Sequence, residues 1–417
     1  MIETLLNLDF SQVFILLQII SGLLFFGAIF FLPKLMVWQA NRRLNATITD
    51  LEAYHNDAEE YFLENMKPTN GYSERYRSMK NFQFSQPTNL DPAGMVDRLE
   101  NVLDASEHKF KRFVKRNADT DDEEELADLN MAFKGVMGTH QMKLVIEHFQ
   151  ELMNKTQNFQ LVTIVQMMLP IYTEIAESQK GATRAFADNA PIGDAIGPMV
   201  AAKMITEEPE EISEDIIHSE EEINDQNVHI VKSKGPGARL GKYGEALEKL
   251  SEENDLEAII TVDAASKFES EETGTVNEGV GVMMGGPGVE KSKIEEVATE
   301  HGIPLEGVVI KQSGPEASKP MKKEIFDAWK PATKKAKQII SEFDGDVAVV
   351  GVGNTCGIGN NRDSTRGVHN KLRKYWDEYE QQEEDDVSYM GLMSIMGGPD
   401  QQHQMDRINS VIWKGLR

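Results

Sequence analysis

The sequence predicts an N-terminal transmembrane helix, then an α-helical bundle, then an α/β domain with a mainly parallel sheet. Three observations predict this fold class. Residues 13–32 form an uncharged apolar run, and apolar residues recur at helical spacing through the first half of the chain. From residue 190 onward glycine becomes frequent, and short apolar runs alternate with helical patterns. A length of 417 residues is enough for two or three domains.

The apolar run reads VFILLQIISGLLFFGAIFFL over residues 13–32. Its length is what an α-helix needs to cross a hydrocarbon core of ~30 Å, whereas a buried core helix is seldom apolar for so long. Lys34, Arg42 and Arg43 follow it, and positive charge stays on the cytoplasmic side. We therefore expect residues 1–12 outside, residues 13–32 in the lipid bilayer, and the remainder in the cytoplasm at the cell membrane.

The next two segments are predicted to be helical. Residues 33–89 should hold a juxtamembrane helix and a linker, because Pro68 and Gly71 interrupt the helical pattern. Residues 90–189 show apolar residues at a helical period and should form the bundle.

Residues 190–356 should form the α/β domain. Residues 258–262, 307–311 and 347–352 are short, mainly apolar runs, which are typical of strands buried on both faces of a parallel sheet. The expected strands are residues 216–223, 228–232, 258–262, 307–311 and 347–352, with a hairpin turn at Asn224 and Asp225 and helices at 291–300 and 321–343. Residues 357–417 are polar and are predicted to be an appendage with little core.

The composition excludes one class of partner and indicates a compartment. There are 69 acidic and 43 basic residues, a net charge of −26, and such an excess repels nucleic acid. The acidic excess also fits a salt-adapted, archaeal source. Cys356 stands alone, so a disulfide framework is impossible within the chain and a reducing compartment is the natural one.

Three glycine-rich loops invite a phosphate-binding interpretation, and each departs from a known motif. In the first loop, Pro236 and Tyr243 stand where a P-loop needs Gly and Ser or Thr. In the second loop, Glu290 stands before Lys291, where a P-loop needs Gly. In the third loop, Cys356 stands where the dinucleotide-binding motif needs its third glycine. No cofactor is predicted. The loops also fit tight turns at the carboxyl ends of strands, where open α/β sheets bind ligands. The candidate cleft-lining residues are Gly193, Gly197, Gly281, Gly285, Gly286, Gly288, Gly351, Gly353, Asn354 and Thr355.

Two acids stand beside these loops. Asp194 lies in PIGDAIGPMVAAKM and Asp263 in AIITVDAASKFESEETG. Taken singly, Asp194 fits a helix N-cap and Asp263 an acid that stabilises a loop after a strand. Together with the segment GVGVMMGGPGVEK and the strand GVVIK, they resemble the spore germination protease family, whose fold is shared with the hydrogenase maturation endopeptidases.

That resemblance implies a pair of catalytic carboxyl groups at Asp194 and Asp263. The family has a strand and a glycine turn before its first Asp, and here VAVVGVGNTCG at residues 347–357 has that character, so a circularly permuted domain would follow. Residues 347–352 should then be an inner strand beside residues 258–262. The endopeptidases also use a His as a metal ligand, but no His stands at a matching position here, so no metal ligand is predicted.

The whole chain also resembles an archaeal membrane-protein family designated domain of unknown function 1512, which implies no activity. Two functions remain open. One is a membrane-tethered hydrolase in which Asp194 and Asp263 act on an amide of an unidentified peptide or protein. The other is a non-catalytic membrane scaffold or small-ligand sensor that uses the glycine loops.

Overall fold

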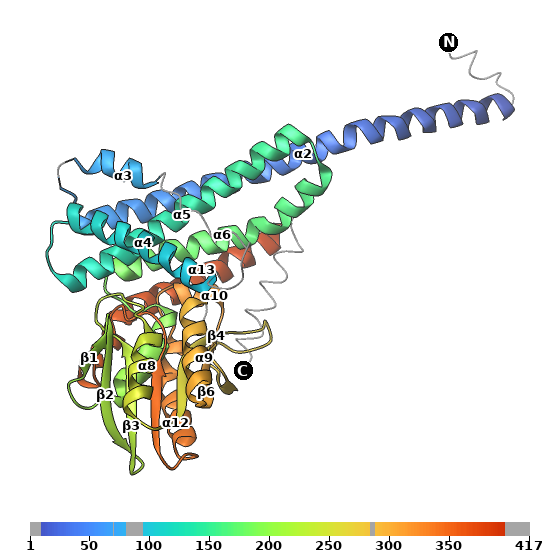
Figure 1. Ribbon diagram of the computed structural model, residues 1–417. Helices are drawn as coiled ribbons and strands as arrows, with labels where there is room; N and C mark the ends of the chain where they lie inside the picture. The colour runs from blue at the N-terminus through green and yellow to red at the C-terminus, as the bar shows by residue number, and fades with distance from the viewer. Residues whose placement is uncertain (1–9, 70, 81–94, 284–287, 397–417) are drawn as a thin grey trace. The chain divides into compact units, whose positions relative to one another are not determined.

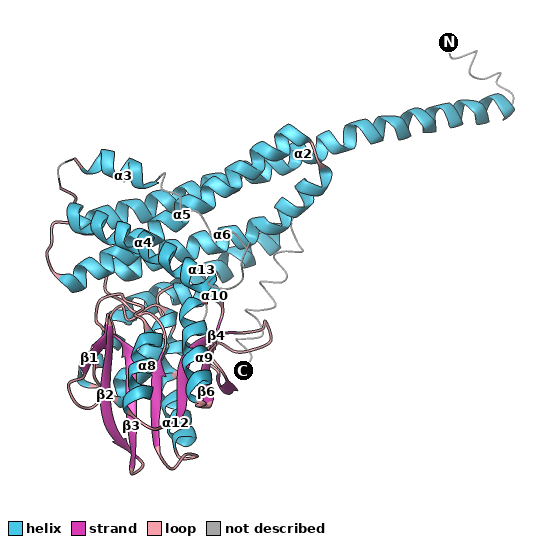
Figure 2. Cartoon of the chain, in the orientation of Figure 1, coloured by secondary structure: helices cyan, strands magenta, loops and turns pink. Residues whose placement is uncertain are grey.

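The computed structural model describes residues 10–69, 71–80, 95–283 and 288–396, and the chain divides into two compact units, Met1–Asp188 and Asn189–Arg417. Figures 1 and 2 show helices in the first unit, and strands together with helices in the second. The predicted order, a helical region followed by an α/β domain, is confirmed. The ranges left out include Gly285 and Gly286, two of the predicted cleft-lining residues.

The described part of the first unit is built from helices alone. They are α2 (Phe10–Met66), α3 (Tyr72–Lys80), α4 (Met95–Asn117), α5 (Glu123–Thr156) and α6 (Phe159–Ala187). Side chains before α5 and α6 satisfy N–H groups that the helical pattern leaves open: Asp122 accepts from Glu124 and Glu125, and Asn158 accepts from Gln160 and Leu161.

The second half of α2 belongs to the core of the bundle, which the sequence had placed at residues 90–189 alone. Val37, Ala40, Leu44 and Leu51 are buried in one cluster with apolar residues of α5 and α6. These residues recur at three and four positions, so they form one stripe on a helix whose other faces are polar. The helix ends at Met66, and the predicted break in the chain lies there.

The first half of α2 carries apolar side chains that have no cover in the first unit. The described side chains from Phe14 to Leu32 are mostly exposed, with Leu23 at 68% and Phe31 at 72%. Within the predicted span of residues 13–32, the side chains of residues 13, 28 and 30 lie outside the described ones.

No helix in the described part of the chain combines the length and the apolarity that crossing a membrane requires.

The second unit contains one mixed sheet. Its strands over the described residues lie in the order β1-β2-β3-β7-β4-β6-β5. They are β1 (Glu210–Ser213), β2 (Ile216–Ile223), β3 (Gln226–Ser233), β4 (Leu256–Ser266), β5 (Val276–Val280), β6 (Leu305–Gln312) and β7 (Asp346–Gly351). The neighbours β3, β7, β4 and β6 are parallel, whereas β1, β2 and β5 pair antiparallel at the edges.

The mainly parallel core of the sheet is therefore confirmed, and so is the inner position of residues 347–352. The strand β7 lies between β3 and β4 and is hydrogen-bonded to both. The hairpin of β2 and β3 turns at Asn224 and Asp225, whose φ angles of 56° and 62° are left-handed, as a two-residue hairpin turn requires.

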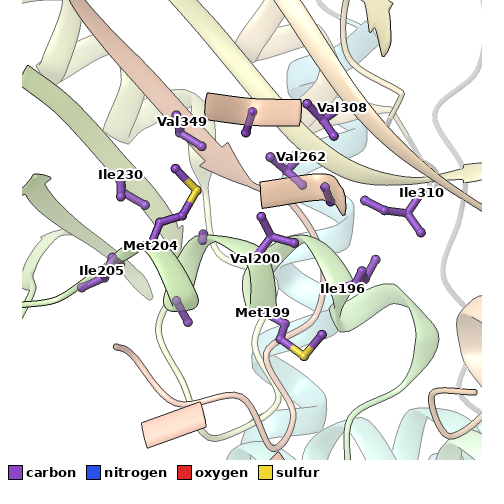
Figure 3. Close-up of a cluster of buried hydrophobic side chains, with 14 of the residues drawn as sticks. Ile196, Met199, Val200, Met204, Ile205, Ile230, Val262, Val308, Ile310 and Val349 are labelled. Atoms are coloured by element: carbon purple, nitrogen blue, oxygen red, sulfur yellow. The ribbon is translucent and has the colours of Figure 1, made fainter. Parts of the chain in front are cut away.

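Helices cover both faces of this sheet. On one face, α7 (Ile196–Met204), α12 (Trp329–Ile340) and α13 (Val368–Met396) share a core with Val262, Val308 and Val349. Figure 3 shows Val200 and Met204 of α7 directed at these strands, whereas Met199 lies on the other side of the helix. On the other face, α8 (Tyr243–Glu253) and α9 (Val289–His301) share a second core with Ile259 and Val350.

Some elements of this unit differ from the prediction. The sequence gives no apolar signal for β5, because its side chains are exposed or half-buried at the sheet edge. The helix expected at residues 321–343 is two helices, α11 (Lys323–Asp327) and α12, which meet at Ala328. The short helix α10 (Gly314–Ser318) and two 3-10 turns, η1 (Gly193–Ala195) and η2 (Asp363–Thr365), complete the unit.

The predicted polar appendage is corrected as well. Val368, Leu372 and Trp376 of α13 are buried in the core of the second unit, and Trp376 Nε1 donates to Met321 O at 2.8 Å. One apolar stripe on a highly charged helix is enough to bury that helix against a sheet. Residues 397–417 lie outside the described ones.

Candidate functional site

Asp194 lies in η1, directly before α7, and its carboxylate is bonded to a different element. Its Oδ2 accepts the Asn354 N–H, 2.9 Å away, from the turn that follows β7. The residues at the N-cap positions of η1 and α7 are Ile192 and Ala195, and neither cap has a side-chain hydrogen bond. Asp194 is therefore not a helix cap, and it joins the start of α7 to the carboxyl end of β7.

Asp263 lies near the carboxyl end of β4 and is only 2% exposed. Its Oδ1 accepts the N–H of the next residue, Ala264, at 2.6 Å. Its Oδ2 is buried and has no hydrogen-bond partner among the described residues. A buried carboxylate oxygen without a donor is costly, so this position favours the protonated acid.

The two acids interact electrostatically. Burial raises the pKa of Asp263 well above the usual range, and the charge of Asp194 raises it further. Burial also raises the pKa of Asp194, but the Asn354 N–H opposes that rise because it stabilises the carboxylate. Asp194 is therefore the member of the pair that ionises more readily, and Asp263 is the member that keeps a proton.

Tyr243, at the start of α8, contacts the ends of β3 and β7 and lies within electrostatic reach of both acids. Its hydroxyl donates to Gly351 O at 3.1 Å and lies 2.7 Å from Ser233 Oγ. Burial raises the pKa of Tyr243, the hydrogen bonds from its surroundings lower it, and the charges of Asp194 and Asp263 raise it. The phenol thus remains a neutral hydrogen-bonding group beside the acids.

The turn after β7 uses most of its backbone donors within the protein. The acceptors of these N–H groups are Val262 O for Val352, Asp194 Oδ2 for Asn354, Arg239 O for Thr355, Asn354 Oδ1 for Cys356 and Pro236 O for Gly357. A phosphate-binding loop needs several of these N–H groups directed at its ligand. This turn instead positions Asp194.

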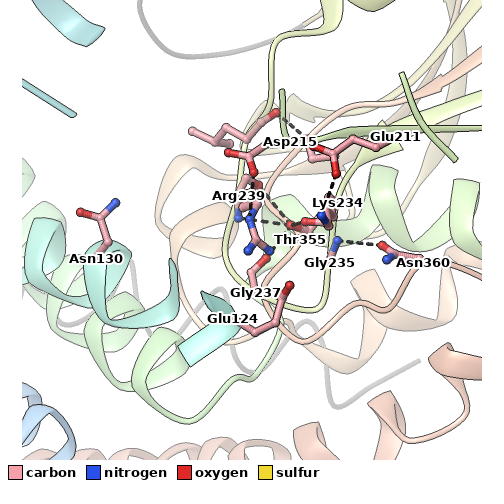
Figure 4. Close-up of polar contacts among 12 residues, drawn as sticks. Glu124, Asn130, Glu211, Asp215, Lys234, Gly235, Gly237, Arg239, Thr355 and Asn360 are labelled. Atoms are coloured by element: carbon pink, nitrogen blue, oxygen red, sulfur yellow. Dashed lines mark hydrogen bonds and ion pairs between the residues drawn. The ribbon is translucent and has the colours of Figure 1, made fainter. Parts of the chain in front are cut away.

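The loop at residues 235–244 is also held by internal contacts (Figure 4). Arg239 Nε lies 3.0 Å from Asp215 Oδ1, and the Gly235 N–H donates to Asn360 Oδ1 at 2.7 Å. Thr355 Oγ1 donates to carbonyl oxygens of the same loop, with Gly237 O at 2.7 Å. These contacts tie the ends of β3 and β7 together.

The predicted cleft-lining glycines do not all lie together. Gly197, Gly351 and Gly353 lie where α7 crosses the ends of β4 and β7, with the predicted Asn354 and Thr355 in the same turn. Gly281 follows β5 near Glu306 at the amino end of β6, whereas Asp263 pairs with Val309 farther along that strand. Gly288 precedes α9.

Gln312, the last residue of β6, is a candidate that the sequence reasoning missed. It is 2% exposed, and neither atom of its amide has a hydrogen-bond partner among the described residues. A Cβ added at Gly193 would lie 2.6 Å from Gln312 Oε1, so the amide packs against the residue before Asp194. A polar residue directly after the apolar run GVVIK was the available signal.

One surface cavity, of about 450 Å³, is found elsewhere in the unit. It is lined by residues of α12 and by Asn224 in the β2–β3 turn, which is near the amino ends of the parallel strands. Neither acid lines it. Residues 284–287, part of the loop predicted to line a cleft beside the acids, lie outside the described residues, so that cleft stays a prediction.

Comparison with known families gives matches over most of the chain. Residues 18–189 match the model described as the N-terminal domain of a protein of unknown function (DUF1512), and residues 192–359 match the domain of unknown function (DUF1512) C-terminal. The chain belongs to the DUF1512 family. The two matched regions of this DUF1512 protein meet where its helical unit passes into its α/β unit. No curated protein and no solved structure is similar enough to match.

Proposed function

We propose that this DUF1512 protein is a membrane-anchored hydrolase in which Asp194 and Asp263 act as a base and an acid on an amide bond. The observation that carries the proposal is the buried Asp263 Oδ2, which has no partner among the described residues and lies within the electrostatic reach of Asp194. Pairs of carboxyl groups whose surroundings separate their pKa values are typical of general acid–base sites.

The two environments assign the roles. Asp194 accepts a backbone N–H, which favours its carboxylate, so it is the member of the pair that takes a proton from a water molecule. As that water attacks the amide carbon, the Asp263 proton passes to the carbonyl oxygen. The intermediate then breaks down: the proton on Asp194 passes to the leaving nitrogen, the C–N bond breaks, and a hydroxyl of the intermediate returns a proton to Asp263. The resemblance to the germination protease family supports the same two residues.

The activity test uses the full-length chain in detergent and a peptide library whose cleavage products are identified by mass spectrometry. We expect cleavage by the wild type and a loss of at least about 100-fold in Asp194→Asn and Asp263→Asn, because an amide can neither take up nor deliver the proton. The rate should have a bell-shaped pH dependence that reports the pair.

Glu221→Gln is the matched control for these variants. Glu221 is a buried carboxylate of the same unit and lies in β2, apart from the candidate site. Its Oε1 accepts the Thr206 N–H at 2.7 Å. Cleavage that survives in both Asp variants, or no cleavage by the wild type under any condition of the library, would remove the proposal of a hydrolase.

The proposed anchor is the apolar part of α2. It supplies about 20 uncharged residues, and its described side chains are exposed in the protein itself. Lys34, Arg42 and Arg43 follow, and Arg42 lies over the Trp38 ring at 5.3 Å from its centroid. Basic residues and Trp at the end of an apolar helix are typical of the membrane interface on the cytoplasmic side, which supports a cytoplasmic position for both units.

Placing two charges in this segment should release the protein from membranes. Each acidic residue at the centre of a span costs about 2.5–3.5 kcal/mol, so we expect the double variant Leu23→Asp, Leu24→Asp to leave the membrane pellet after an alkaline wash, while the wild type stays. Substitution is preferable to removing residues 1–40, because Val37 and Ala40 are buried in the bundle.

The control changes equally exposed apolar residues of the other unit, Phe268→Asp with Val280→Asp, at 75% and 77% exposure. That variant should behave as the wild type does. If the wild type were itself washed off, or if the Leu23 and Leu24 variant stayed bound, the apolar part of α2 would not be the anchor.

A further inference from the structure

A cluster of two histidines and a glutamate lies on the hairpin of β2 and β3, away from the proposed acid site. His218 and Glu220 are two positions apart on β2, and Glu220 is directly opposite His229 on β3. Alternation along a strand therefore places all three side chains on the same face of the sheet. One nitrogen or oxygen from each lies within 4.8 Å of the others, and His218 Nε2 is 3.0 Å from His229 Nδ1.

The buried histidine is oriented by groups on its other side. His229 is fully buried, and its Nε2 lies 3.6 Å from Asp346 Oδ2 at the start of β7. Asn227 Nδ2 in turn donates to the same Asp346 oxygen at 3.1 Å. Asn227 Nδ2 also lies 3.4 Å from His229 Nε2. In the tautomer that carries its proton on Nε2, the lone pair of Nδ1 faces His218 and Glu220. A carboxylate behind a ligating histidine is the usual arrangement at a metal site.

The surroundings favour a cation. The carboxylates of Glu220, Glu210 and Glu253 lie near enough to act on His218 electrostatically. Glu210 is opposite His218 in the pairing of β1 with β2, so its carboxylate is the candidate for a fourth donor, from the neighbouring strand. The excess of negative charge in the chain acts in the same direction.

We propose that His218, Glu220 and His229 bind one divalent transition-metal ion of the zinc class. Two imidazole nitrogens and one carboxylate are a donor set of zinc sites, with the fourth position left for water or Glu210. Nitrogens bound to tetrahedral Zn²⁺ at ~2.0–2.1 Å are roughly 3.3 Å apart, close to the present separation. Bound there, the ion would join β2 to β3 at the antiparallel edge of the sheet.

The test is a metal titration of the full-length protein in detergent. Metal is removed with a chelator, and Zn²⁺ is then titrated against a coloured competitor in excess Mg²⁺, which occupies the acidic surface. We expect one tight Zn²⁺ per chain, a visible spectrum typical of tetrahedral coordination with Co²⁺, and an affinity at least about 10-fold lower in His218→Gln and in Glu220→Gln.

His301→Gln is the matched control, because His301 of the same unit also lies beside a carboxylate, with Nε2 3.6 Å from Glu248 Oε1. It should bind Zn²⁺ as the wild type does. Glu220 is exposed, so its variant reports binding even if a histidine variant fails to fold. Equal Zn²⁺ affinity in the wild type and Glu220→Gln, or no stoichiometric binding by the wild type, would overturn the proposal. The two histidines would then be a stacked, hydrogen-bonded pair.

Discussion

Gly197→Ala should destabilise the α/β unit by about 3 kcal/mol or more, at or above the upper end of the usual cost of overpacking. A Cβ at this position would lie 2.1 Å from Val352 O and 2.4 Å from Val262 O. Both atoms are backbone, and Val262 O already accepts the Val352 N–H. Neither can move without breaking the contact between β4 and the turn after β7, so α7 must shift.

The measurement is chemical denaturation of the full-length protein, followed by a signal from the second unit, with Gly367→Ala as the control. A Cβ at Gly367 meets no heavy atom within 4 Å, and its φ is not left-handed. The control should change stability by less than about 1 kcal/mol. If both variants were equally stable, α7 would not be packed against the strand ends as closely as the structure has it.

Asp263→Asn should be more stable than the wild type at neutral pH. The folded-state pKa of Asp263 is raised, so the folded protein holds this proton more tightly than the unfolded chain does. The stability that the Asp263 proton contributes is therefore fully present below the ordinary carboxyl pKa of ~3.9. This stability is lost as the pH rises from there through the folded-state pKa of Asp263. An asparagine at this position is neutral at every pH, so the variant does not lose this stability as the pH rises.

The difference in unfolding free energy between the variant and the wild type should thus grow with pH, by about 1.4 kcal/mol for each unit of pH crossed within that window. Glu221→Gln provides a control of opposite sign. Burial raises the pKa of Glu221, but the hydrogen bonds from Thr206 and Ser219 outweigh burial and leave that pKa lowered. Its variant should lose stability at neutral pH and approach the wild type in acid. A loss of stability at neutral pH in Asp263→Asn would show that Asp263 is an ionised structural acid.

The sequence predicted the parts of the fold whose residues carry a regular pattern. Residues 347–352 are apolar at every position because β7 is buried on both faces, and that pattern identified an inner strand. The pattern failed for β5 at the sheet edge, where no face is buried. It also failed to predict that α13 is buried, because a single stripe of Val368, Leu372 and Trp376 is hidden among charged residues.

The sequence indicated which residues to consider for the candidate site, but not the hydrogen bonds that position them. Asp194 and Asp263 came from short motifs, and the structure brings them within electrostatic reach of each other. The bond from Asn354 to Asp194 crosses 160 positions of the chain, so no local pattern could indicate it. Tyr243 reaches the ends of β3 and β7 through tertiary packing, which a motif search does not see.

The central claim is that Asp194 and Asp263 form one coupled pair in which Asp263 keeps the proton. The most direct test follows the ¹³C signals of the two carboxyl groups by NMR as pH is raised, in the wild type and in Asp194→Asn. The account predicts that Asp263 remains protonated at pH values where exposed carboxyl groups are ionised, and that its pKa falls when the Asp194 charge is removed. An Asp263 that ionises in the ordinary range, or whose titration is the same in Asp194→Asn, would contradict it.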